Sequence, residues 1–123
     1  MIYVIAAPEI SPGRVKIGYT SKKPIFRMGE LQTGCPVLLE LIMQFNGDMA
    51  LEKELHKWFA PFRTHCEWFE FGELDAAQEI ADVYEACEGD FRNLRQMRSD
   101  VMMENRKRLQ QEHMAKWRAG QGR

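Results

Sequence analysis

Four residues with reactive or charged side chains lie in or beside the apolar segments of the amino-terminal half: Tyr3, Lys16, Arg27 and Glu52. A free phenol releases its proton only near pH ~10, so it is a poor base at neutral pH, but a cation within about 4–6 Å favours the phenolate. A guanidinium is always charged and matches two phosphate oxygens at once. A carboxylate suits Mg²⁺, which takes one or two carboxylates and keeps most of its waters. What these residues do depends on whether the fold brings them together.

The elements that must position them begin with two short strands. Residues 2–6 and 14–19 are rich in β-branched residues and are joined by a loop with a Pro-Gly turn signal, which favours a hairpin. Side chains alternate along a strand, so Lys16 and Gly18 share one face and Tyr19 lies on the opposite, core-facing one. Gly18 is expected where a helix or a phosphate approaches the backbone closely, with a plain bulge as the alternative.

Helices and further strands follow in an order typical of a mixed fold. Thr20 or Ser21 and, later, Asp48 are the expected helix N-caps. The predicted elements are a helix from Pro24 to about residue 33, a strand over 37–45, a helix from Asp48 to about Pro61, a strand over 68–71, a helix over 74–87, and a long exposed helix from residue 90 that frays toward 120–123. We therefore expect an α+β fold with a small three-stranded antiparallel sheet flanked by helices and a C-terminal helical extension.

Two segments in this order carry a family resemblance: Ile2-Tyr3-Val4-Ile5 and Val15-Lys16-Ile17-Gly18-Tyr19-Thr20. Together they resemble the two half-motifs of the GIY-YIG nuclease superfamily, and most closely the phage and bacterial branch whose second half reads K-I-G. The resemblance continues through Arg27 and the segments 30–36, 51–56 and 67–69. It covers about residues 1–72, as a nuclease core, and leaves 73–89 as a packing helix and 90–123 as a basic helical tail.

The resemblance implies a metal-dependent DNA endonuclease or nickase that hydrolyses phosphodiester bonds. In similar enzymes the first tyrosine, here Tyr3, sits beside the attacking water, and Lys16 would supply the nearby cation. The helix arginine, here Arg27, binds the phosphate, and Glu52 holds Mg²⁺ or Mn²⁺, which stabilises the departing oxygen. DNA is the implied substrate, with RNA as a second candidate. The residues that could support this site are Gly18, Tyr19, His56 and Glu67.

The chain departs from the family pattern at several positions. No glycine precedes Ile2, Lys16 replaces the second tyrosine, and Glu67 lies near the place where many members carry an asparagine. Structural alternatives therefore stay open for each site residue. They are a core tyrosine at Tyr3, a solvated lysine at Lys16, a surface pair of Arg27 with Glu30, a solvated glutamate (which would describe Glu54 better than Glu52), a packed histidine at His56 and a salt bridge at Glu67.

The charges divide the chain into two parts. The chain of 123 residues carries 17 Lys/Arg and 18 Asp/Glu, but residues 1–90 hold 8 of the basic and 15 of the acidic residues, whereas residues 91–123 hold 9 and 3. A basic segment binds the DNA backbone with strong salt dependence, and Trp117 could stack on a base. The alternative is a helix that docks on the acidic part of the same chain or of a homodimer partner. The candidate DNA-binding residues are Arg92, Arg95, Arg98, Arg106, Lys107, Arg108, Lys116, Trp117 and Arg118.

Other function classes are weighed against this one. A non-catalytic nucleic-acid- or protein-binding module, including a phage effector against host proteins, would keep the fold without cutting DNA. Zinc held by His56, His65, Cys66 and a further cysteine matches no usual spacing. An odd number of widely spaced cysteines favours the reducing cytoplasm, that of the host if the chain is phage-encoded. No apolar run reaches the ~20 residues of a membrane span, so no membrane partner is expected.

Overall fold

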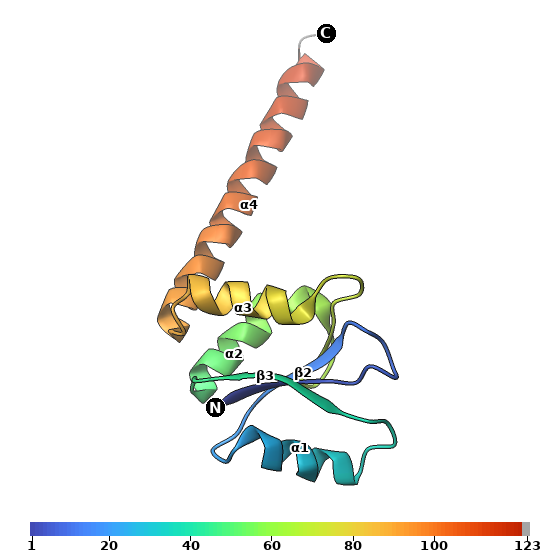
Figure 1. The fold of residues 1–123 in the computed structure, drawn as a ribbon. Helices are drawn as coiled ribbons and strands as arrows, with labels where there is room; N and C mark the ends of the chain where they lie inside the picture. Colours follow the sequence, from blue (N-terminus) through green and yellow to red (C-terminus); the bar gives the residue numbers. More distant parts are fainter. Residues whose placement is uncertain (122–123) are drawn as a thin grey trace.

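A five-stranded antiparallel sheet forms the centre of the computed structural model, which describes residues 1–121 (Figure 1). The strand order is β3-β1-β2-β5-β4. The strands are Ile2–Ala6 (β1), Arg14–Tyr19 (β2), Glu40–Phe45 (β3), Arg63–His65 (β4) and Trp68–Glu70 (β5). The α+β class is confirmed, but the prediction of a three-stranded sheet is wrong.

The two additional strands, β5 and β4, form a short hairpin on the open edge of β2. β5 pairs with β2 over three residues, Val15 facing Phe69 at the centre. β4 consists of three exposed residues, so hydrophobic periodicity gives no sign of it. Cys66 makes the tight turn with a φ of 51°, a left-handed conformation that is uncommon for residues other than glycine.

Four α-helices and one short 3₁₀ turn complete the fold. They are Pro24–Thr33 (α1), Met49–Trp58 (α2), the 3₁₀ turn Ala60–Phe62 (η1), Ala76–Ala86 (α3) and Phe91–Gln121 (α4). Asp48 caps α2 as predicted, because its Oδ1 accepts the Leu51 N–H at 2.8 Å. The predicted cap of α1 is wrong. Thr20 instead accepts the Lys22 N–H, and α1 begins after Lys23 without a side-chain cap.

The helices cover the sheet from both sides (Figure 1). α1 lies on one face, where Tyr3 and Ile5 form a small cluster that Met28 packs against. α2 and α3 lie on the other face over the main core, which includes Ile2 and Val4. Because β1 is central and covered on both faces, its five residues are all buried. Alternation along β1 therefore sends Tyr3 toward α1.

The long helix α4 follows a turn that Gly89 makes with a φ of +68°. Its first two turns contact the body, with Leu94 fully buried. Residues 99–120 are all exposed, so the rest of α4 extends away from the body (Figure 1). The fraying expected toward 120–123 lies partly outside the described residues. No helix within residues 1–121 has both the length and the apolar character needed to cross a bilayer.

Candidate functional site

The ring of Tyr3 lies over Gly18, its direct partner on the neighbouring strand. A β-carbon at Gly18 would overlap with Cζ and the hydroxyl of Tyr3, so only glycine leaves room for the ring. The close approach predicted at Gly18 is present, but the approaching group is an aromatic ring and not a helix or a phosphate. Tyr3 is buried, whereas Tyr19 is half-buried at the end of β2 and lies outside the core clusters.

Arg27 of α1 reaches this ring from the face that α1 covers. The Tyr3 hydroxyl and the Glu30 carboxylate both raise the pKa of the Arg27 guanidinium, with Tyr3 as the larger cause. Arg27 also donates to Glu30 at 3.1 Å, so the predicted surface pair exists as well. The sequence led us to expect Lys16 as the cation next to Tyr3. The cation next to the Tyr3 hydroxyl is Arg27.

Lys16 is instead bound to Glu67. Its ammonium donates to Glu67 Oε2 at 2.6 Å, and its side chain is only 12% exposed. The hairpin of β4 and β5 sets this pair, because the Ile17 N–H donates to the Glu67 carbonyl just before β5 begins. The charge of Lys16 is therefore neutralised by Glu67, and Lys16 is not a solvated strand lysine.

His56 of α2 binds β2 at Ile17, just beyond the residues of β2 that pair with β5. Its Nε2 donates to the Ile17 carbonyl at 2.7 Å, which requires the proton on Nε2. Burial lowers the pKa of His56, so the ring is neutral at pH 7. The edge of the ring meets Phe69. His56 is thus a packed histidine that positions α2 against β2.

Glu52 lies one turn before His56, and its carboxylate Oε1 is 3.7 Å from His56 Nε2. Burial raises the pKa of Glu52, and the negative charge of Glu67 raises it further, while Lys16 opposes the shift. Within the described residues, no N–H or O–H donates a hydrogen bond to Glu52. The result is a largely buried carboxylate, 13% exposed, beside a second carboxylate. Such a group gains from a nearby cation.

These groups gather around β1 and β2 from two sides. Tyr3 and Arg27 lie on the face that α1 covers, and Lys16, two residues from Gly18 on the same face of β2, lies diagonally from Tyr3 at roughly 7–8 Å between backbones. Glu67 pairs with Lys16, and the charges of Glu67 and Lys16 both act on Glu52 of α2. Within residues 1–121, no three His, Cys, Asp or Glu side chains gather as a metal cluster, and His65 and Cys66 are exposed on the β4–β5 hairpin. The zinc alternative therefore has no site in this part of the chain.

Comparison with known protein families shows to which family the chain belongs. The family profile described as the T5orf172 domain matches residues 1–87, well over half of the chain. The chain belongs to the T5orf172 domain family. This phage-associated domain is related to nuclease-type domains and to nucleic-acid functions, which agrees with the resemblance at that coarser level. No curated protein and no solved structure matches the chain.

Helix α4 lies beyond the matched T5orf172 domain and is fastened to it by Glu54. This side chain is only 1% exposed, and it accepts hydrogen bonds from Arg95 at 3.1 Å and Arg98 at 3.3 Å. The expectation of a solvated Glu54 is wrong, and the docking alternative holds for these two arginines. Arg92 pairs with Asp90. The spacing of Glu54 three residues after Leu51, on the apolar stripe of α2, was the signal for burial that the sequence offered.

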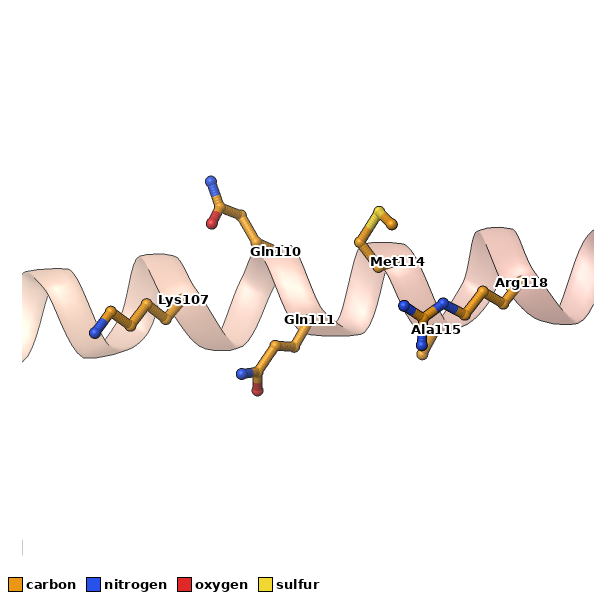
Figure 2. A pocket seen from close by; sticks show the side chains of 6 residues that line it. All are labelled: Lys107, Gln110, Gln111, Met114, Ala115 and Arg118. Carbon is orange, nitrogen blue, oxygen red and sulfur yellow. The ribbon is translucent and has the colours of Figure 1, made fainter.

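The outer part of α4 carries its side chains into solvent. The candidate DNA-binding residues there are Arg106, Lys107, Arg108, Lys116, Trp117 and Arg118, all exposed. Figure 2 shows Lys107, Gln110, Gln111, Met114, Ala115 and Arg118 arranged along this helix, with no other element of the T5orf172 domain beside them. The shallow hollow between these side chains belongs to a helix surface and is not an enclosed cavity.

Proposed function

We propose that this T5orf172 domain is a divalent-metal-dependent endonuclease or nickase of GIY-YIG type that acts on DNA. One observation carries the proposal: Arg27 lies beside the Tyr3 hydroxyl on β1, and the half-buried carboxylate of Glu52 is close enough to Lys16 of the neighbouring strand β2 to feel its charge. Phosphodiester hydrolysis needs both a cation for the phosphoryl oxygens and a group at the attacking water. The raised pKa of the half-buried Glu52 supports this function over simple packing, because a bound cation would stabilise its charge.

The donor set at Glu52 fits Mg²⁺ or Mn²⁺. Such ions use one or two carboxylates and fill the remaining positions with water and phosphate. Glu52 would be the ligand, and Glu67 lies close enough to raise its pKa, so a bound cation relieves the repulsion between the two carboxylates. When bound, the ion supplies Lewis-acid stabilisation of the leaving oxygen.

The protein side chains have distinct tasks in this proposal. Arg27 binds a phosphoryl oxygen and, through its contact with the Tyr3 hydroxyl, fixes the phosphate relative to that hydroxyl. The Tyr3 hydroxyl orients the attacking water. Lys16 is paired with Glu67 and so does not compete for the position of Arg27.

The basic residues of the outer α4 supply affinity for the DNA backbone in this proposal. The acidic body repels DNA, so affinity must come from elsewhere. Arg95 and Arg98 neutralise Glu54, and Arg92 pairs with Asp90, which leaves five basic residues among residues 91–121 for these contacts: Arg106, Lys107, Arg108, Lys116 and Arg118. Contacts of this kind bind DNA regardless of sequence.

The test is cleavage of supercoiled plasmid. The protein is incubated with plasmid and Mg²⁺ or Mn²⁺, and a parallel reaction contains EDTA. We expect nicked circles that accumulate with the metal and not with EDTA. Binding of the plasmid without any cut in DNA or RNA would instead support a non-catalytic binding module.

A further inference from the structure

The outer half of α4 extends away from the rest of the described chain (Figure 1). Residues 99–120 are all exposed. Helices of this kind are only marginally stable in water, because most helical stability in proteins comes from packing an apolar face. A helix that extends this far needs a surface to pack against.

One face of residues 99–120 carries three of the six large exposed apolar side chains of this segment. Met102, Leu109 and Trp117 recur after seven and eight residues, about two turns each, so they lie on one side of the helix. They are 55%, 60% and 54% exposed. Gln111 follows Leu109 by two residues, about 200° around the helix, so it lies on the opposite side. We call Met102, Leu109 and Trp117 the apolar stripe.

We propose that the apolar stripe packs against the same stripe of a second copy of this chain, with the two helices antiparallel. The apolar stripe is self-complementary about its centre, because Leu109 lies midway between Met102 and Trp117. In an antiparallel pair centred near Leu109, Met102 of one copy lies opposite Trp117 of the other. The two bodies then sit at opposite ends of the paired helices, so they do not collide.

The charge distribution selects the antiparallel arrangement. Residues 99–104 contain two acidic residues and no basic one, residues 106–108 are all basic, and residues 116–118 contain two basic residues. A parallel pair would set each basic stretch against its own copy, and like charges in register repel. An antiparallel pair sets the acidic start of one helix beside the basic end of the other, and the stretch 106–108 beside Glu112.

In this dimer Trp117 packs against the second copy and does not stack on a DNA base. The indole becomes part of the dimer seam, while the basic side chains flank it. Each outer helix keeps an excess of basic over acidic residues after pairing, so the dimer presents a longer basic surface than one chain does. The proposal is independent of nuclease activity, because it concerns only residues 99–121.

The test measures the mass of the full chain without DNA, by sedimentation equilibrium over a range of micromolar concentrations. We expect twice the chain mass for the wild type and for Gln111→Glu, and the chain mass for Leu109→Glu. The two variants add the same side chain two positions apart, so only its side of the helix differs. Far-UV circular dichroism should show less helix for Leu109→Glu. A wild type that stays monomeric, or a Leu109→Glu variant that stays dimeric, overturns the proposal.

Disulfide formation tests the orientation. In a Cys35→Ser, Cys66→Ser background, Leu109→Cys lies near the two-fold axis of an antiparallel pair and should form a disulfide-linked dimer on mild oxidation. Met102→Cys lies far from its own copy and should stay reduced. Efficient cross-linking through Met102→Cys, with or without Leu109→Cys, would show a parallel pair and contradict the proposed arrangement.

Discussion

The ring of Tyr3 occupies the space that a side chain at Gly18 would fill, so the two residues depend on each other across β1 and β2. This contact places the Tyr3 hydroxyl beside Arg27 rather than elsewhere on the α1 face. The glycine of the second half-motif therefore has a physical role, which is to seat the tyrosine of the first.

Gly18→Ala should displace the Tyr3 ring. The added methyl would overlap with Cζ and the hydroxyl, so we expect a loss of about 1–3 kcal/mol in the free energy of unfolding, together with loss of activity. Gly29→Ala is the matched control. It meets nothing within 4 Å inside α1, and it should stabilise the protein by about 0.5–1 kcal/mol. Urea denaturation measures both, and equal effects of the two variants would contradict the contact.

Tyr3→Phe should separate chemistry from packing. It removes only the hydroxyl that contacts Arg27, so we expect plasmid nicking to fall by about 10²-fold or more while the melting temperature changes little. Tyr84→Phe makes the same chemical change far from the site. It removes the hydrogen bond from the Tyr84 hydroxyl to the Asn46 carbonyl, with a cost of about 0.5–1.5 kcal/mol, and should cut normally. A Tyr3→Phe variant that cuts at the wild-type rate would remove Tyr3 from the chemistry.

Glu54→Gln should loosen α4 from the body. The substitution leaves Arg95 and Arg98 without their carboxylate, and we expect a loss on the order of 1–3 kcal/mol at pH 7. Burial acts to raise the pKa of Glu54, but Arg95, Lys57 and Arg98 outweigh it, so the pKa lies below 4.5. The stabilisation is therefore fully present above pH 4.5 and is lost as the pH falls through the lower, folded-state value.

The measurement is the difference in unfolding free energy between wild type and Glu54→Gln from pH 3 to pH 7. It should be largest at pH 7 and shrink in acid. Glu85→Gln, an exposed change on α3, should show no such difference. A wild-type advantage that is constant across this range would mean that Glu54 acts through packing and not through its charge.

Replacement of Arg106, Lys107 and Arg108 by Gln should weaken DNA binding. Removal of each side chain that neutralises a phosphate makes the slope of log K against log salt shallower by up to about 0.9, so the triple variant should show lower affinity and weaker salt dependence together. Arg95 and Arg98 are bound to Glu54, and their contribution to DNA affinity should be smaller. Fluorescence anisotropy at several salt concentrations measures this. An unchanged slope would assign the outer α4 to protein contacts alone.

The parts of the fold that follow from local physics could be predicted from the sequence. The content of β-branched residues placed β1, alternation placed β2, and Asp48 before an apolar stripe predicted the start of α2. β4 could not be predicted, because its polar residues gain their strand conformation only from pairing with β5. The partner of Lys16 depends on that same hairpin, so the sequence could suggest Glu67 as a salt-bridge residue without naming Lys16.

The residues of the candidate site could be named from the sequence, but the contacts between them could not. Tyr3, Arg27 and Glu52 came from a resemblance, whereas the pairing of Arg27 with the Tyr3 hydroxyl depends on how α1 packs on the sheet. Glu54 was missed because a helix glutamate is usually solvated. Its burial is stabilised by Lys57 on α2 and by Arg95 and Arg98 of α4, over forty residues later.

Glu52→Gln should not destabilise the folded protein. Burial and Glu67 raise the pKa of Glu52 above 4.5, so the folded state disfavours its charge. A group of this kind stabilises the fold only below the unfolded-state pKa, and it opposes folding once the pH rises through the folded-state value. The free energy of unfolding of Glu52→Gln should therefore equal or exceed that of wild type at pH 7 and match it at pH 4, as measured by urea denaturation.

The most direct test of the nuclease proposal is the rate of plasmid nicking by wild type and by Glu52→Gln as Mg²⁺ is titrated. The wild-type rate should rise with Mg²⁺ and saturate, Glu85→Gln should follow it, and Glu52→Gln should stay at the background rate while remaining fully folded. Equal nicking by wild type and Glu52→Gln, or no nicking by wild type at any Mg²⁺ or Mn²⁺ concentration, would contradict the proposed function.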